Sequence, residues 1–159
     1  MLNEWNREKL SVERPSLRIL AAEDNEINQA VLKAILQPLG LEPLIVENGA
    51  EAVEAWQTQR FDIVLMDVQM PVLDGLDATR EIRRREVELG LAATPIIALT
   101  SNVLQHQVAE CLDAGMDGHL AKPIQIDKLF ATLLAAYKLC ADGDQTPATF
   151  WRIQGRTDL

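Results

Sequence analysis

Several polar side chains stand directly after short apolar segments of this chain, where the strands of a parallel sheet would end. They are Glu23, Asp24, Asp67, Thr100, Ser101 and Lys122. Three carboxylates in one crevice repel one another unless a cation is present, and a small set of oxygen ligands suits Mg²⁺, or Mn²⁺ in its place. Hydroxyls and an ammonium group on the other side would receive an anion. The set therefore indicates a phosphoryl-transfer site in which an aspartate can act as the nucleophile.

The elements that must position these residues are five short apolar runs, each followed by a helical pattern. The expected strands are Leu17–Ala22, Leu44–Val46, Phe61–Met66, Pro95–Leu99 and Gly118–Ala121. This alternation predicts an α/β fold, a doubly wound parallel sheet with helices on both faces. Because ligands of such sheets bind beyond the carboxyl ends of the strands, side chains up to 99 positions apart should meet in one crevice.

The expected helices are identified by apolar residues at helical spacing. Either Asp24 or Asn25 could cap the first helix. Its apolar stripe comprises Ile27, Ala30, Val31, Ala34, Ile35 and Leu39. The clearest stripe, on the last helix, comprises Ile126, Leu129, Phe130, Leu133, Leu134 and Tyr137. A basic run at 83–85 falls on the third helix, and we expect it to be solvated surface.

The composition is that of one globular domain. The 159 residues are 48% hydrophobic, enough for an ordinary core. With 15 basic and 24 acidic residues, the net charge of −9 disfavours a nucleic-acid or anionic-membrane surface. The sequence has neither an apolar run of about 18 residues for a membrane span nor a secretory signal. Its few cysteines, Cys111 and Cys140, favour a reduced, cytoplasmic setting, and a zinc site is not expected.

The alternating pattern also suggests domain boundaries. We expect residues 17–141 to form the domain, with 1–16 as an N-terminal tail or linker and 142–159 as a C-terminal tail. Both ends are polar, and each contains one tryptophan, Trp5 or Trp151. They are interpreted as tails or docking segments.

Each polar signal, taken alone, has a simpler structural explanation. An acidic pair after a strand is usually a helix N-cap, a threonine there is usually a cap, and Lys-Pro is usually a solvated turn. Their joint placement at four strand ends is much harder to obtain by chance. The phosphoryl-transfer interpretation is therefore favoured.

Four blocks of the sequence carry most of these residues. They are AAEDNEINQ (21–29), DIVLMDVQMPVLDG (62–75), PIIALTSN (95–102) and AGMDGHLAKPI (114–124). Together they closely resemble the receiver domain of two-component response regulators, and their wording is most similar to receivers attached to hybrid histidine kinases. The resemblance covers about residues 17–140. It implies a flavodoxin-like (βα)5 sandwich with strand order 2-1-3-4-5.

The resemblance implies a phosphoacceptor beside a metal site. Asp67 corresponds to the phosphoacceptor and also to a metal ligand. Asp24 corresponds to the direct Mg²⁺ ligand, and Glu23 to a neighbour that acts largely through metal-bound water. The backbone carbonyl of Gln69 corresponds to the third protein ligand. Glu23 replaces the more usual aspartate, and we expect function to survive this change.

The resemblance also implies a switch. Thr100 corresponds to a hydroxyl that moves to the phosphoryl group, and Lys122 to the cation that pairs with it, before a Lys-Pro bond that is typically cis. His119 replaces the usual Tyr or Phe, so the switch could be pH-sensitive, or His119 could switch nothing. Phosphorylation would shift the face formed by the fourth helix, fifth strand and fifth helix. The positions that tune the phosphoryl lifetime would be Gln69 and Asn102.

The implied partner is a histidine kinase or a histidine phosphotransfer domain. Its docking surface would comprise Ile27, Asn28, Val31, Pro123 and Ile124. A stripe on the first helix is more often core than interface, so both explanations stay open. The output would be a protein contact or a relay, because the remaining residues are too few for a DNA-binding or catalytic domain.

Two other functions fit these residues less well. A phosphorylation-independent interaction scaffold would not need the intact set of strand-end residues. A phosphatase of the haloacid-dehalogenase type would need a second aspartate where this chain has Gln69. We therefore expect a phosphoacceptor signalling domain. Met1 and the irregular ends allow a free-standing regulator, whereas the motif wording favours a part of a hybrid kinase.

Overall fold

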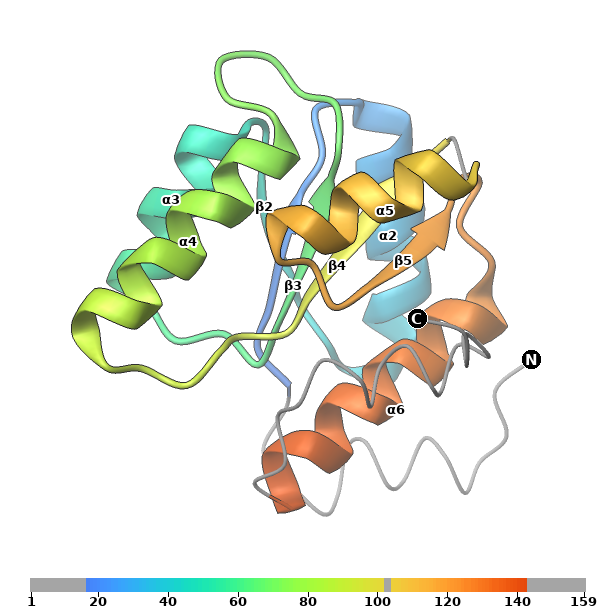
Figure 1. The fold of residues 1–159 in the computed structure, drawn as a ribbon. Coiled ribbons are helices and arrows are strands. Elements are labelled where there is room, and N and C mark those ends of the chain that lie inside the picture. Colours follow the sequence, from blue (N-terminus) through green and yellow to red (C-terminus); the bar gives the residue numbers. More distant parts are fainter. Residues whose placement is uncertain (1–16, 102–103, 143–159) are drawn as a thin grey trace.

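The computed structural model describes residues 17–101 and 104–142, which form a parallel sheet flanked by helices (Figure 1). The strands are β1 (Ile19–Ala22), β2 (Leu44–Val46), β3 (Ile63–Asp67), β4 (Ile96–Thr100) and β5 (Gly118–Ala121). The helices are α2 (Glu26–Leu36), α3 (Gly49–Thr58), α4 (Gly75–Leu89), α5 (Gln105–Ala114) and α6 (Ile126–Asp142), with a short 3₁₀ turn (Gln37–Leu39) after α2.

The sheet order is β2-β1-β3-β4-β5, and all four strand pairs are parallel. The predicted flavodoxin-like order and the doubly wound α/β class are therefore confirmed. In register, Ala22 pairs with Met66, and Asp67 pairs with Leu99. The ends of β1, β3 and β4 consequently lie side by side, and the residues that follow them share one edge of the sheet.

Two apolar layers cover the two faces of the sheet. Ile19 and Ala21 pack with α2 and α6, whereas Leu20 and Ala22 pack with α3, α4 and α5. Successive residues of a strand point to opposite faces, so a strand that is covered on both sides must be apolar throughout. This requirement explains the continuous apolar runs of β1, β3 and β4, whose residues are buried along their whole length.

The predicted apolar stripe of the first helix is wrong in part. Ile27 is 74% exposed and Val31 is 38% exposed, whereas Leu32 and Leu36 are fully buried. Leu32, Ile35 and Leu36 are spaced by three and four residues, so they form the face that meets the sheet. The stripe of α6 is confirmed at Leu129, Phe130 and Leu133, which are buried, and at Leu134, which packs against the same core cluster; Ile126 is 49% exposed.

The domain boundaries remain a prediction, because residues 1–16, with Trp5, and 143–159, with Trp151, lie outside the described residues. Within the described part of the chain, β1 begins at Ile19, two residues later than expected. Among the described helices, none combines the length and the apolar character that crossing a membrane requires.

Candidate functional site

The turn between β1 and α2 is organised by Asn25. Its side chain accepts hydrogen bonds from the backbone amides of Ile27 and Asn28, at 2.9 and 3.1 Å. Of the two predicted caps, Asn25 is therefore the one observed. Because an uncharged side chain caps the helix, the carboxylates of Glu23 and Asp24 are not explained by capping.

Glu23 is fully buried and held at four points. Its amide donates to the carbonyl of Val46 at 2.9 Å, and its own carbonyl accepts from the Gln29 side chain at 2.6 Å. Its carboxylate accepts from the amide of Asn25 at 3.1 Å and pairs with the ammonium group of Lys122 at 2.9 Å. These contacts fix the buried carboxylate at the end of β1.

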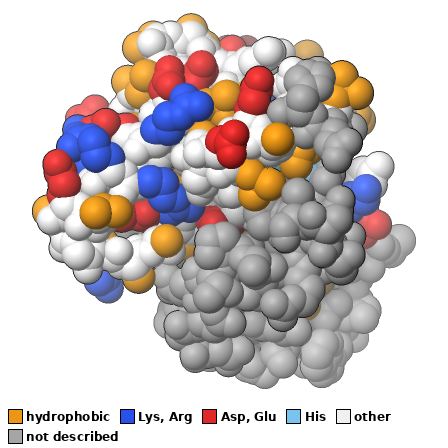
Figure 2. Space-filling model, viewed as in Figure 1, with side chains coloured by type: hydrophobic (Ala, Val, Ile, Leu, Met, Phe, Trp, Pro, Cys, Tyr) orange, Lys and Arg blue, Asp and Glu red, His pale blue; other side chains and the backbone are white. Residues whose placement is uncertain are grey.

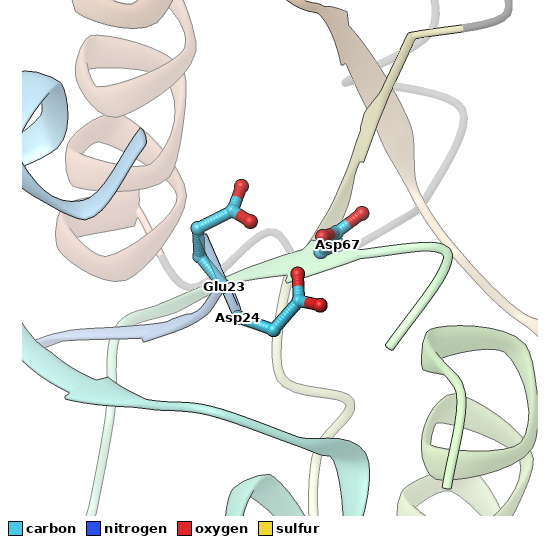
Figure 3. Close-up of side chains that lie close together, drawn as sticks. All are labelled: Glu23, Asp24 and Asp67. Carbon is cyan, nitrogen blue, oxygen red and sulfur yellow. The ribbon is translucent and has the colours of Figure 1, made fainter. Parts of the chain in front are cut away.

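Asp67 ends β3 and is 4% exposed. Its Oδ1 accepts from the amide of Gln69 at 3.2 Å, and its Oδ2 lies 3.1 Å from the ammonium group of Lys122. Glu23, Asp24 and Asp67 each contribute one carboxylate oxygen to a group within 4.8 Å, and Figure 3 shows these side chains around one space. The oxygen atoms fit the ligand set of a hard divalent cation.

The electrostatics of this site are dominated by burial and by the shared lysine. Burial and the charge of Glu23 raise the pKa of Asp67 to about 7, although Lys122 opposes this rise. For Glu23, burial also opposes ionisation, but hydrogen bonds from Lys122 and Asn25 outweigh it and lower the pKa. Burial disfavours the charged form of Lys122, yet its hydrogen bonds to Glu23 and Asp67 raise its pKa. One ammonium group thus balances part of a threefold acidic cluster.

The other predicted switch residues lie along β4 and β5. Thr100 is the last residue of β4 and is 7% exposed, and its carbonyl accepts from the amide of Lys122 at 2.8 Å. His119 is half-buried on β5 opposite Ala98. The Lys122–Pro123 bond is cis, as the resemblance implied. Asn102 lies outside the described residues.

The predicted docking residues lie near the same end of the sheet. Ile27 and Val31 are exposed on α2, which excludes them from the core, and Asn28 is half-buried. Pro123 is exposed, whereas Ile124 is half-buried and packs against the core. Their function as a docking surface stays a prediction.

Gly75 is a site residue that the sequence analysis did not single out. It is the first residue of α4, after the cap formed by Asp74. A Cβ atom at Gly75 would clash with the carbonyl oxygen of Asp67. Glycine therefore lets the start of α4 lie directly against the end of β3. The Asp-Gly pair after the loop was the available signal.

Comparison with known proteins identifies the class. Residues 19–134 match the model of the response regulator receiver domain, and the chain belongs to this family, which serves phosphoacceptor signalling in two-component systems. The chain is 41% identical over 117 residues to sensor protein GacS of Pseudomonas syringae pv. syringae, covering 74% of this chain and 13% of GacS. It is 36% identical over 135 residues to aerobic respiration control sensor protein ArcB of Escherichia coli, covering 85% and 17%. The chain thus spans only a small part of these relatives.

Two solved structures are similar to this chain. The receiver domain of sensor histidine kinase PA1611 of Pseudomonas aeruginosa PAO1 has 47% identity and a TM-score of 0.64, covering 71% of this chain and 90% of that one. It was solved with a magnesium ion coordinated in its active-site cleft. The receiver domain of Saccharomyces cerevisiae Ssk1, crystallised with the histidine phosphotransfer protein Ypd1, has 31% identity and a TM-score of 0.77, covering 84% and 97%.

Proposed function

We propose that this chain accepts a phosphoryl group on Asp67 from a phosphohistidine of a partner protein and later releases it as phosphate. The observation that carries the proposal is the position of Asp67. It ends a buried strand, 3.1 Å from a lysine and beside two further carboxylates. A helix cap or a solvated turn would require none of these neighbours.

We further propose that the acidic cluster holds Mg²⁺, or Mn²⁺ in its place. The ligands would be the carboxylates of Asp24 and Asp67, the carboxylate of Glu23 largely through water, and the backbone carbonyl of Gln69. The three carboxylates exceed the charge of Lys122 by two, so a divalent cation fits this donor set. When bound, the cation supplies positive charge that offsets the negative charge on the oxygens of the transferred group.

The protein's own residues perform the transfer in two steps. A carboxylate oxygen of Asp67 attacks phosphorus, while the P–N bond to the imidazole of the partner breaks and its electron pair stays on the ring nitrogen. Water then hydrolyses the acyl phosphate, which restores the carboxylate. Lys122, already placed beside Asp67, offsets the charge of the transferring group. Side chains at Gln69 and Asn102 would tune the lifetime.

The phosphoryl group adds negative charge where one carboxylate stood. We infer that Thr100 and Lys122 follow this charge, with His119 as the candidate switch ring. The face formed by α5, β5 and α6 would then shift between two arrangements and change its affinity for an output protein. The substitution His119→Phe tests whether His119 takes part in this shift and whether its part depends on pH.

The phosphohistidine partner is proposed to be a histidine kinase or a histidine phosphotransfer domain that docks on the exposed side of α2. Ile27 at 74% exposure and Val31 at 38% give an apolar surface on this helix. The likeness to the Ssk1 receiver, which was crystallised with Ypd1, supports a partner of this kind. Figure 2 shows a different face, on which basic and acidic side chains are interspersed over α4.

Intact-mass measurement with acetyl phosphate and Mg²⁺ tests the proposed function. We expect wild type to gain one phosphoryl group, and Asp67→Asn or wild type in EDTA to gain none. Glu81→Gln, an acidic residue on α4 away from the cluster, is the matched control and should be labelled like wild type. A labelled Asp67→Asn would place the acceptor elsewhere. An unlabelled, folded wild type would favour the phosphorylation-independent scaffold.

A further inference from the structure

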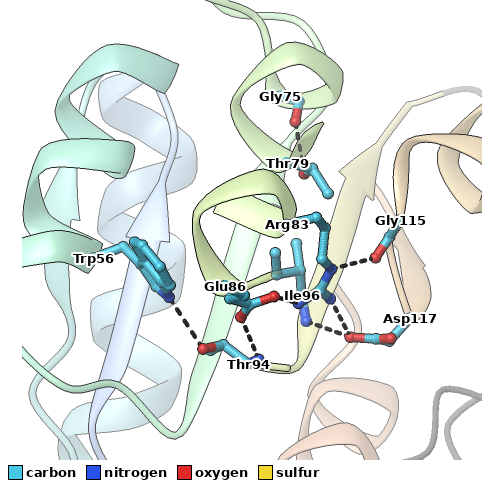
Figure 4. Close-up of polar contacts among 9 residues, drawn as sticks. All are labelled: Trp56, Gly75, Thr79, Arg83, Glu86, Thr94, Ile96, Gly115 and Asp117. Atoms are coloured by element: carbon cyan, nitrogen blue, oxygen red, sulfur yellow. Dashed lines mark hydrogen bonds and ion pairs between the residues drawn. The ribbon is translucent and has the colours of Figure 1, made fainter. Parts of the chain in front are cut away.

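Arg83 is a half-buried member of the basic run and the one that reaches another part of the fold. Its side chain is 19% exposed, whereas that of Arg84 is 53% exposed. The guanidinium group of Arg83 donates to the carbonyl of Gly115 at 2.9 Å and to the carboxylates of Glu86 and Asp117, both at 2.8 Å (Figure 4). The prediction that the whole run is solvated is therefore wrong for Arg83. Neighbouring residues of a helix point in different directions, so Arg83 lies against the protein while Arg84 faces solvent.

The acidic partners of Arg83 also hold the segments at the start of β4 and β5. The carboxylate of Asp117 accepts from the amide of Ile96 at 2.9 Å, and the amide of Asp117 donates to the carbonyl of Ile96 at 2.7 Å. The carboxylate of Glu86 accepts from the amide of Thr94 at 2.7 Å. Glu86 and Asp117 are buried, at 3% and 4% exposure. Arg83 thus completes a charged network at the end of the strands opposite to Asp67.

Lys122 directly follows the strand that this network anchors, β5. β5 lies at one edge of the sheet, has only four residues and pairs with β4. Asp117 directly precedes it, and Lys122 directly follows it. At about 3.3 Å per residue, these two residues lie roughly 16 Å apart along the strand. A displacement at Asp117 would therefore be carried along a short edge strand to the ammonium group.

Helix α4 connects both ends of this arrangement. Its first residue, Gly75, packs on the acceptor strand, and the Gly75 amide donates to the carbonyl of Val68 at 3.0 Å. Arg83 follows eight residues later, about 12 Å along the helix axis. One helix therefore contacts the strand of Asp67 at its start and, through Arg83, the residues that directly precede β5.

We propose that Arg83 and Asp117 are positioning residues for Lys122. Their ion pair fixes the position of β5 along the strand direction relative to β3. It thereby keeps the ammonium group of Lys122 beside the Asp67 carboxylate. A guanidinium group suits this task because its planar fork meets three acceptors at once, which an ammonium group on a flexible stem cannot do with the same geometry. The inference rests on the proposed function of Asp67 as the acceptor.

A substitution of Arg83 and a matched control at Arg84 test the planar guanidinium group separately from its positive charge. Arg83→Lys keeps the positive charge and removes the fork, and Arg84→Lys makes the same change at an exposed neighbour that pairs within α4. Asp117→Asn is the second variant. It retains an acceptor for the Ile96 amide but loses the negative charge that pairs with Arg83. It therefore tests the inference independently if Arg83→Lys does not fold.

The position of β5 is measured first, without phosphorylation. Amide hydrogen exchange should be about tenfold or more faster at Lys122, whose amide donates to Thr100, in Arg83→Lys and Asp117→Asn. Arg84→Lys should match wild type within about twofold. Unchanged exchange at Lys122 in both folded variants would overturn the inference, whether or not the protein is a phosphoacceptor.

A double-mutant cycle with Lys122→Ala then tests the link to chemistry. We expect Arg83→Lys to slow labelling of Asp67 by acetyl phosphate about five- to tenfold when Lys122 is present, and less than about twofold in the Lys122→Ala background. Equal slowing in both backgrounds would show a general structural role and overturn the inference. Absence of labelling in wild type would instead contradict the proposed function, while the exchange measurement would still decide the role of Arg83.

Discussion

Replacing Asp67 by asparagine should stabilise the metal-free protein at neutral and alkaline pH. Burial and the charge of Glu23 raise the pKa of the Asp67 carboxyl from 3.8 to about 7. Between these values the folded protein holds a proton that the unfolded chain has lost. The contribution of Asp67 to the free energy of unfolding must therefore fall as the pH rises through this window, and it stays low above it.

The magnitude follows from the same pKa. A rise from 3.8 to about 7, at about 1.4 kcal/mol per pH unit, corresponds to roughly 4 kcal/mol at pH 8. Relaxation and water penetration reduce such penalties in real proteins. We therefore expect the free energy of unfolding of Asp67→Asn to exceed that of wild type by about 2–4 kcal/mol at pH 8, and to match it within about 0.5 kcal/mol at pH 4.

Urea unfolding in EDTA, followed by circular dichroism between pH 4 and pH 8, measures this difference. Asp113→Asn, at an exposed position of α5, is the control for loss of one negative charge. Mg²⁺ should stabilise wild type more than Asp67→Asn and so narrow the gap. The reasoning would be refuted by equal stability of the two proteins at pH 8 without metal, or by a difference that does not change with pH.

Three further results are expected. Gly75→Ala should slow labelling of Asp67 and lower the free energy of unfolding by about 1–3 kcal/mol, because its Cβ would clash with the Asp67 carbonyl. Intact-mass measurement would show the slower labelling, and urea unfolding would show the lower stability. Ile27→Asp should slow transfer from a phosphorylated histidine phosphotransfer protein about tenfold but leave labelling by acetyl phosphate unchanged, since Ile27 is 74% exposed. Transfer at the rate of wild type would exclude the exposed side of α2 as the docking surface. Trp56→Phe removes the indole donor to Thr94 and should cost about 1 kcal/mol in urea unfolding, with labelling unaffected.

The fold and the gathering of the acidic residues could be predicted because both follow from rules that connect sequence to topology. Apolar runs that alternate with helical patterns specify a parallel sheet, and the residues after its strands must meet at one edge. The three carboxylates within 4.8 Å confirm that inference for Glu23, Asp24 and Asp67. The buried face of the first helix was harder to predict, because several apolar residues could form it. Leu32 and Leu36 occupy it, which leaves Ile27 and Val31 in solvent.

The contacts of Arg83 and Lys122 could not be predicted in the same way, because they depend on which acceptors the fold brings to a long side chain. Three consecutive arginines look equivalent in the sequence, yet only the phase of α4 decides which of them faces β5. Lys122 was assigned to the phosphoryl group, whereas in the absence of that group it pairs with both Glu23 and Asp67. An ammonium group so placed can exchange one anionic partner for another without crossing solvent. If Asp67 accepts a phosphoryl group as we propose, the added charge would strengthen a contact that already exists, and the pull on Lys122 would act on the end of β5, which this lysine directly follows.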